Sequence, residues 1–160
     1  MPQSEIKIVR KDGPVVPKNQ LSLQILPKQH FKIGDTMQIR VTSHQSGYVF
    51  VWDINSAGKL TRILPNDMAQ RHLMTAGQTI TIPEHSYSGF SLTMTEPTGK
   101  GIVVATLVEN QFKQKLLSER FGSISATQAH NALQQMRSRL NQMLEPTNDL
   151  ITTLEYEITH

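Results

Sequence analysis

Apolar and polar residues alternate along most of the first 110 positions. Leu21, Leu23 and Ile25 fall on one side of an extended chain, and Ser22 and Gln24 fall on the other. A period of two residues is typical of a β-strand with one buried face. The same period recurs over residues 6–8, 37–42, 59–64, 80–82 and 90–95.

Two segments are apolar on both sides. Residues 48–52 read Tyr-Val-Phe-Val-Trp, and residues 102–108 are equally apolar. Such runs predict central strands that are covered on two faces. Turn residues at 55–58 and 97–101 separate these runs from their neighbours, so about eight short strands punctuated by turns are expected, a pattern typical of a β-sandwich.

The period changes after residue 110. Phe112, Leu116 and Leu117 predict a short helix, with Gly122 as a plausible stop. A second helix is expected over 126–144, where apolar residues recur at alternating steps of three and four, and Ser125 with Gln128 has the spacing of a capping box. The stripe comprises Ala126, Ala129, Leu133, Met136, Leu140 and Met143. Alternation returns over 150–158 and predicts a final strand.

These elements predict a mainly β protein, an immunoglobulin-like β-sandwich with a C-terminal α-helix and a closing strand. We expect a single domain over 1–160, with a β core at 31–110 and the helical segment plus the final strand at 111–160. The length of 160 residues, the 38% hydrophobic content and the 18% charged content fit one globular unit.

Half of the chain contains a series of short blocks in a recognisable order. The blocks are residues 31–35, 47–53 with 58–59, 63–66, 76–79, 82–83 and 96–99. In order and spacing they resemble the bacterial domain-of-unknown-function family numbered 4384 over residues 31–110. The resemblance implies a β-rich accessory module without assigned catalysis, found in bacterial envelope or secreted proteins and beside caspase-like peptidase or kinase domains.

The net charge of +3 is modest, and Arg10-Lys11 is the only adjacent basic pair. Aromatic residues do not interleave with the Lys and Arg, so we do not expect nucleic-acid binding. No apolar run is long enough to span a membrane. No signal sequence is recognised at the first residues. We therefore expect the protein to be located in the bacterial envelope or periplasm, or to be secreted, if a leader was removed, and to be cytoplasmic otherwise.

Common catalytic patterns are missing from the sequence. The six histidines show neither His-x-His nor His-Glu-x-x-His spacing, and the chain has no cysteine. Gly58-Lys59 and Gly99-Lys100 lack the rest of a phosphate-binding loop, and no Gly-x-Ser-x-Gly elbow occurs. Asp53, Asn55 and Gly58 resemble part of a calcium loop, but the later Glu is missing and the segment is too short, so we expect a hairpin turn there. We therefore predict a non-enzyme with no metal and no cofactor.

Three features are candidates for binding. Tyr48 and Trp52 belong to a row of aromatic rings on one face of a strand. Exposed rings of this kind could bind carbohydrate, whereas buried rings would form part of the hydrophobic core. The loop over 66–77 is long for a sandwich, which is typical of functional loops. The apolar stripe of the 126–144 helix could pack either on its own domain or against a helix of a partner. The candidate contact residues are Tyr48, Trp52, Met68, Arg71, His72, Met136 and Leu140.

The sequence thus favours a protein–protein interaction module that acts as an accessory domain in a bacterial envelope, secretion or regulatory system. A homo-oligomer through the 126–144 helix is a further possibility. The alternatives are a carbohydrate- or cell-wall-binding module at Tyr48 or Trp52, and a small hydrolase. The hydrolase would need a histidine within hydrogen-bond reach of a serine or a carboxylate.

Overall fold

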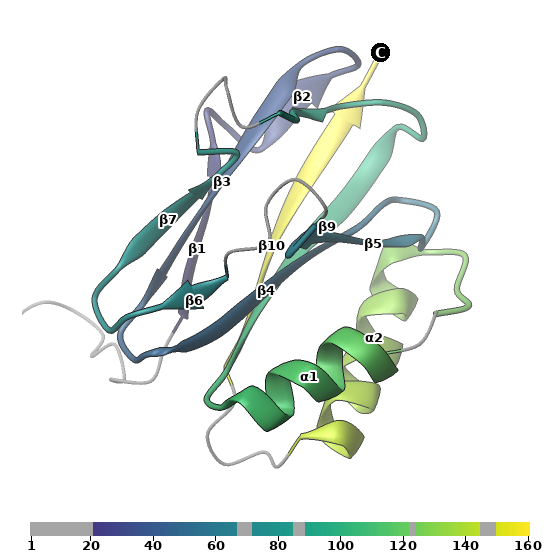
Figure 1. The fold of residues 1–160 in the computed structure, drawn as a ribbon. Coiled ribbons are helices and arrows are strands. Elements are labelled where there is room, and N and C mark those ends of the chain that lie inside the picture. Colours follow the sequence, from purple (N-terminus) through teal and green to yellow (C-terminus); the bar gives the residue numbers. More distant parts are fainter. Residues whose placement is uncertain (1–20, 67–71, 85–88, 122–123, 145–149) are drawn as a thin grey trace, which may run out of the picture.

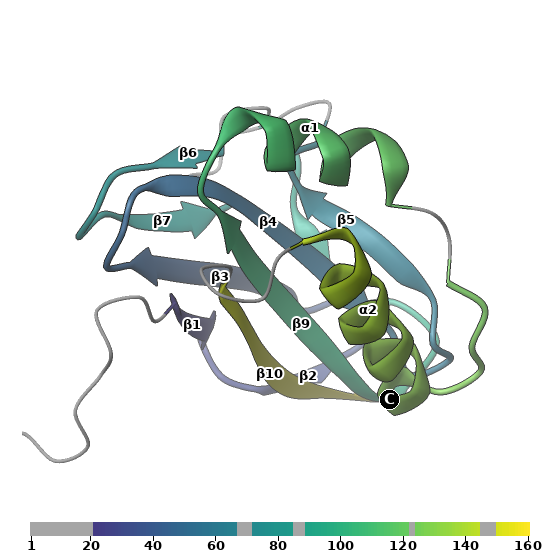
Figure 2. The ribbon, with the colours of Figure 1, turned by 90° about the horizontal axis from the view of Figure 1, so that it is seen from below.

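A computed structural model of the chain describes residues 21–66, 72–84, 89–121, 124–144 and 150–160. These residues form three layers: a four-stranded sheet, a six-stranded sheet and a layer of two helices (Figures 1 and 2). The four-stranded sheet contains β1 (Leu21–Leu26), β3 (Thr36–Ser43), β7 (Thr79–Ile82) and β8 (Leu92–Thr93). The six-stranded sheet contains β2 (His30–Lys32), β4 (Gly47–Ile54), β5 (Leu60–Leu64), β6 (Leu73–Met74), β9 (Gly99–Val108) and β10 (Leu150–Thr159). The helices are α1 (Gln111–Arg120) and α2 (Ala129–Met143).

The six-stranded sheet joins strands from both ends of the described chain. Its order is β2-β10-β9-β4-β5, with β6 paired to the start of β4. Strand β10 pairs antiparallel with β9 and parallel with β2. In the other sheet, β3 pairs with β1, β7 and β8. The last strand of the chain therefore lies inside a sheet and not at its edge.

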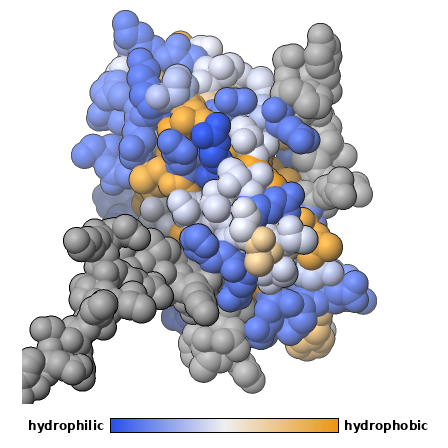
Figure 3. Space-filling view, turned by 90° about the vertical axis from the view of Figure 1, so that its left-hand side faces the viewer, coloured by the Kyte–Doolittle hydropathy of each residue, from blue (hydrophilic) through white to orange (hydrophobic). Residues whose placement is uncertain are grey.

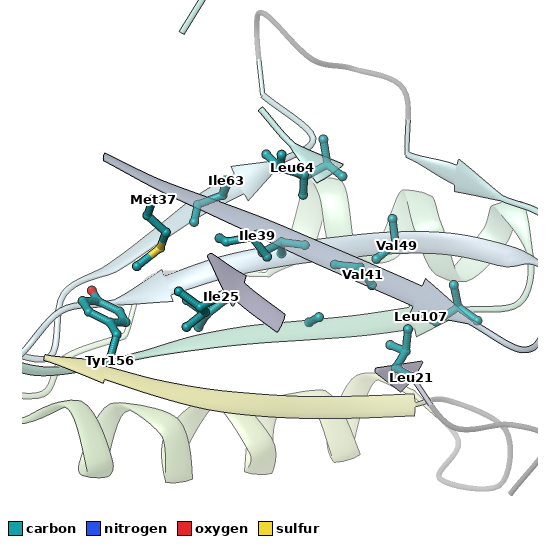
Figure 4. Close-up of a cluster of buried hydrophobic side chains, with 14 of the residues drawn as sticks. Leu21, Ile25, Met37, Ile39, Val41, Val49, Ile63, Leu64, Leu107 and Tyr156 are labelled. Atoms are coloured by element: carbon teal, nitrogen blue, oxygen red, sulfur yellow. The ribbon is translucent and has the colours of Figure 1, made fainter. Parts of the chain in front are cut away.

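The two sheets bury a shared hydrophobic core, which Figure 4 shows. Ile25 and Ile39 of the four-stranded sheet contribute to it, as do Val49 and Val51 of β4. Tyr156 of β10 lies at one end of this core with its ring among the apolar side chains. The inward side of each two-residue alternation supplies these residues, as the sequence pattern predicts.

A second core lies between the six-stranded sheet and the helices. Phe50 and Trp52 of β4 enter it from the sheet, while Leu133 and Met136 enter it from α2 and Leu117 from α1. Because β4 and β9 are covered by the other sheet on one side and by helices on the other, both are apolar on two faces. The prediction of central strands at 48–52 and 102–108 is confirmed.

The outer face of the four-stranded sheet is polar. Gln24 and Arg40 are opposite each other in the β1–β3 register and both are exposed, and the Thr42 and Thr79 hydroxyls hydrogen-bond at 2.7 Å. Figure 3, which views the side of the molecule on which β7 lies in Figure 1, shows hydrophilic groups with smaller hydrophobic patches between them. This face follows the polar half of the alternation.

The predicted hairpin at 55–58 is confirmed. The Asn55 side-chain oxygen accepts from the backbone N–H groups of Ala57 and Lys59 at 3.0 and 2.9 Å, and Gly58 has a φ of +84°. The side chain of Asn55 is thus used to shape the turn between β4 and β5. This geometry explains the Asp53, Asn55 and Gly58 pattern without a calcium ion.

The long helix starts later than the sequence predicts. It runs from Ala129, not from 126, and the predicted capping box is wrong, because Gln128 is the N-cap and makes no side-chain capping bond. The backbone before the helix lies against the β4–β5 turn: a Cβ on Gly58 would be 2.8 Å from the Ala126 carbonyl oxygen. The Gln135 side chain also donates to the Ser125 carbonyl at 2.8 Å. These contacts hold residues 125–128 outside the helix.

Other boundaries agree more closely. The short helix is confirmed as α1 and ends at Arg120, with Asn110 as N-cap accepting from the Lys113 N–H at 2.9 Å. The final strand is confirmed as β10. Strands β2 and β6 were not predicted, and the expected strand at 6–8 lies outside the described residues. Among the described helices, none has the length and apolar character that crossing a membrane would require.

Candidate functional site

Two of the predicted contact residues meet where α1 covers the start of β4. Tyr48 is opposite Leu73 of β6 in the strand register, and His72 directly precedes that strand. The rings of Tyr48 and His72 have their centroids 5.4 Å apart, and the rings of Phe50 and His72 are 5.1 Å apart, edge to face. With Gln114 of α1, these residues form the His72 cluster.

Both nitrogens of the His72 ring face protein atoms. Nδ1 lies 3.2 Å from the Val49 carbonyl oxygen, and Nε2 lies 3.4 Å from the Gln114 side-chain nitrogen, which also lies 3.2 Å from the Ser118 hydroxyl. A neutral imidazole that donates from Nδ1 and accepts at Nε2 satisfies both contacts. The cluster therefore joins β4, the segment that leads into β6 and helix α1.

Burial favours the neutral form of this histidine. Removal from water lowers the pKa of His72, and the charge of Arg62 acts in the same direction, while the hydrogen bond to Val49 opposes both. A neutral ring is the form that can accept from Gln114. The electrostatics and the hydrogen bonds thus support the same structural role.

The structure buries three other predicted contact residues. Trp52 is 3% exposed, stacks on Phe50 and touches the Phe121 ring. Met136 and Leu140 are buried in the core beneath the helices. All three side chains pack inside the protein, so none of them is exposed for contact with a partner. Met68 and Arg71 lie outside the described residues.

These positions remove the surfaces on which two hypotheses depended. A homo-oligomer through the 126–144 helix required an exposed apolar stripe, but that stripe packs on β4 and β9 of its own chain. Carbohydrate binding required an exposed row of rings, but Phe50 and Trp52 are covered and Tyr48 is half-buried against His72.

In the described part of the chain, two histidines contact carboxylates on the surface. His30 Nδ1 is 3.3 Å from Glu157, and His160 Nε2 is 3.4 Å from Glu96. The side chains of His30 and His160 are 59% and 75% exposed, so neither pair is held in a water-excluded cleft. Within the described ranges, no three His, Asp or Glu side chains gather as a metal site would need.

A partly buried carboxyl–phenol pair crosses the six-stranded sheet. The Tyr156 hydroxyl of β10 donates to Asp53 of β4, passing over Gly101 of the intervening strand β9. Burial raises the pKa of Asp53 to about 6, against the smaller opposing effect of the Tyr156 bond, and burial with the Asp53 charge raises the pKa of Tyr156. The pair ties three adjacent strands together.

The Asp53→Asn variant should lose a pH dependence of stability. The pKa of Asp53 is about 6 in the folded protein, against an ordinary value of 3.8 for an exposed aspartate. Between these pH values the folded state therefore binds the proton more tightly than the unfolded state does. Its contribution to the free energy of unfolding therefore falls as the pH rises from about 4 to about 6, by about 3 kcal/mol at most. Urea unfolding at several pH values checks this. A difference between wild type and variant that stays constant with pH would contradict it.

Large apolar side chains reach the surface at three described positions. Phe112 in the first turn of α1 is 76% exposed, Leu73 of β6 is 54% exposed and Ile33 is 39% exposed. Lys115 and Glu119 share the outer side of α1 with Phe112. Helix α1 already packs on the sheet through its other face, so packing within the chain does not account for an exposed phenylalanine at this position.

Residues 30–110, half of the chain, match a family model described as a domain of unknown function, DUF4384. The chain belongs to this family. No curated protein and no solved structure matches it. The DUF4384 segment comprises strands β2 to β9, whereas β1, both helices and β10 lie outside it. Asp53, Tyr48 and His72 are inside the family segment, while Tyr156, Gln114 and Phe112 are outside it.

Sequence reasoning missed Gln114 and the Asp53–Tyr156 pair. An amide on a helix carries no local signal of its contact with a distant histidine. Asp53 had a signal: it directly follows an apolar run, at a position whose alternation with Val49 and Val51 points it into the core between the sheets. A carboxyl at such a position requires a hydrogen-bonding group nearby.

Proposed function

We propose that this chain is a non-enzymatic accessory module that binds another protein. The observation that carries the proposal is the exposure of Phe112, which is 76% accessible on a helix whose opposite side is buried. Phenylalanine is among the residues that are enriched at protein–protein interfaces relative to the rest of the surface. The resemblance to DUF4384 supports a bacterial envelope, secretion or regulatory system as the setting.

The described polar groups also favour binding over catalysis. His72 is hydrogen-bonded at both nitrogens, and Asp53 is bonded to Tyr156 beside the core. A hydrolase would need a nucleophile within reach of a base in a protected cleft. The described histidine–carboxylate contacts are solvent-exposed, which does not supply that environment.

Replacing Phe112 with alanine should abolish capture of the natural protein partner. The wild-type chain, immobilised and exposed to lysate and envelope fractions of its source, should retain one protein at a stoichiometric level. The variant should retain less than about a tenth of it, because loss of a central aromatic anchor commonly costs 2 kcal/mol or more. Quantitative mass spectrometry of the eluates measures both amounts.

Ile33→Ala is the matched control, because Ile33 is also an exposed apolar residue but lies next to β2. It should retain the same protein as wild type. Empty eluates from wild type in every fraction would oppose the proposed function, and retention of only the chain's own copies would replace it with self-association.

We also propose that the two sheets form an immunoglobulin-like sandwich. With β1, β3 and β7 as strands A, B and E and with β4, β9 and β10 as C, F and G, the pairings follow that fold, and both helices fall between F and G. Trp52 departs from the pattern, because it faces the helices and not the core between the sheets. An experimental structure with a different strand order would refute the assignment.

A further inference from the structure

The net positive charge of this protein is concentrated in its helical layer. Residues 109–144 contain five Lys and Arg and two Asp and Glu, and five minus two equals the +3 of the whole chain. From residue 120 to residue 144 there is no acidic residue at all. The rest of the sequence is therefore electrically balanced.

Contacts within the layer leave part of this charge available on its surface. Lys113 pairs with Glu109 at 3.2 Å and its side chain is only 13% exposed. Arg139 lies over the Phe121 ring, 5.6 Å from its centroid. Lys115 and Arg137 are exposed, one on each helix.

The exposed side of α2 is rich in amides. Asn131, Gln134, Ser138 and Asn141 are all exposed and follow one another at steps of three, four and three residues, which places them in one stripe beside Arg137. Their amide and hydroxyl groups donate hydrogen bonds and carry no negative charge to repel an acid. Helix α1 covers the same face of the sheet next to α2 (Figures 1 and 2). It adds Phe112 and Lys115, with the exposed Glu119 one turn beyond Lys115, so the exposed charges of the two helices still sum to a positive value.

We propose that this surface, the helical-layer surface, binds an acidic segment of a protein that also carries a large apolar side chain to pack on Phe112. The inference rests on the proposed function and names the chemistry of its partner. Carboxylates match Arg137, Lys115 and the amide stripe, and the apolar side chain covers the aromatic ring that water otherwise surrounds.

The number of exposed cations decides between acidic partners. Proteins that bind nucleic acid commonly neutralise about 6–10 phosphates, and basic segments that bind anionic membranes hold about 4–8 Lys and Arg. Among its described side chains, the helical-layer surface exposes two cations, Lys115 and Arg137, and one carboxylate, Glu119, among many neutral donors. Two described cations beside amides and one aromatic ring fit a polypeptide and are too few for a phosphate polymer or a lipid surface.

A selection with random peptides tests the inference on the full chain. A phage-displayed library of random 16-residue peptides is selected on the wild-type protein, and the enriched peptides should contain an excess of Asp and Glu together with an aromatic or aliphatic residue. Their affinity should fall about tenfold for Phe112→Ala and at least as much for the double variant Lys115→Glu, Arg137→Glu. Because these side chains are exposed, circular dichroism should show unchanged folding.

Arg40→Glu is the matched control, since Arg40 is an exposed arginine on the outer face of the other sheet. It should leave the affinity unchanged. Neutral or basic consensus peptides, no enrichment, or binding that Arg40→Glu weakens as much as the double variant does would each overturn the inference. So would a gel shift with a 20-nucleotide single-stranded DNA, or co-sedimentation with phosphatidylserine vesicles, that the double variant abolishes.

The natural partner separates this inference from the proposed function. If the wild-type chain captures a stoichiometric protein and the double variant still captures it fully, the helical-layer surface is wrong and the interaction role stands. If the wild-type chain captures no protein, the interaction role itself fails.

Discussion

A chain cut to residues 30–110, the DUF4384 segment alone, should not fold. Strand β10 lies between β2 and β9, so its removal leaves β2 without its strand neighbour and opens the edge of β9. The cut also removes β1 with its buried Leu21 and Ile25, and Tyr156 and Ile158 of β10. At about 2–5 kcal/mol each, these four buried side chains account for about 8–20 kcal/mol, which is as large as the roughly 5–15 kcal/mol that stabilises a typical domain.

Far-UV circular dichroism and proton NMR of the two chains provide the measurement. The fragment should lack the dispersed NMR signals and the cooperative thermal transition that the complete chain shows. A chain ending at residue 144 should recover both when a synthetic peptide of residues 150–160 is added, because the peptide supplies β10. A cooperative transition in the 30–110 fragment would contradict this account of the fold.

The Gly101→Val variant should be the most damaging single substitution described here, with a loss of about 3–5 kcal/mol of stability. A side chain at position 101 would overlap the Tyr156 ring, and its Cβ would lie 2.9 Å from the Ile54 carbonyl oxygen. Tyr156 would have to leave the core and release Asp53, which adds the cost of a buried carboxyl without its bond to the cost of the lost packing. Urea denaturation at pH 7 measures the loss.

Lys100→Val is the control for Gly101→Val, because it introduces the same β-branched residue at the preceding position of β9. Lys100 is exposed and its ion pair with Glu155 spans 3.7 Å between side chains that are both more than half exposed, so the loss should stay below about 1 kcal/mol. Tyr156→Phe should fall between the two, since it keeps the ring and removes only the hydroxyl. Equal losses for both valine variants would reject the steric explanation.

The sequence predicted the kind of each long element but not how the elements pair. Alternation identifies which side of a strand is apolar, and a run that is apolar on both sides identified β4 and β9 as central. Alternation contains no information on neighbours, so the position of β10 between β2 and β9 could not be derived. Strands β2 and β6, of three and two residues, are too short to show a period.

The candidate site could be predicted only in part, because a local pattern does not show which elements become neighbours. His72 was chosen from the length of its loop, and Tyr48 from a row of rings, but their contact depends on β6 returning beside β4. Trp52, Met136 and Leu140 were recognised as able to serve either the core or a binding surface, and only the packing of α2 decides between these uses. The Asp53–Tyr156 bond joins residues 103 positions apart, a distance over which no local pattern operates.

The location of Trp52 gives this protein a built-in optical probe. It is the only tryptophan in the chain, and it lies between β4 and the helices, beside Phe50 and Phe121. Its fluorescence should therefore change when the helices separate from the sheet, whether or not the two sheets come apart. Comparing that emission with the circular dichroism of the strands distinguishes undocking of the helices from global unfolding, without any added label.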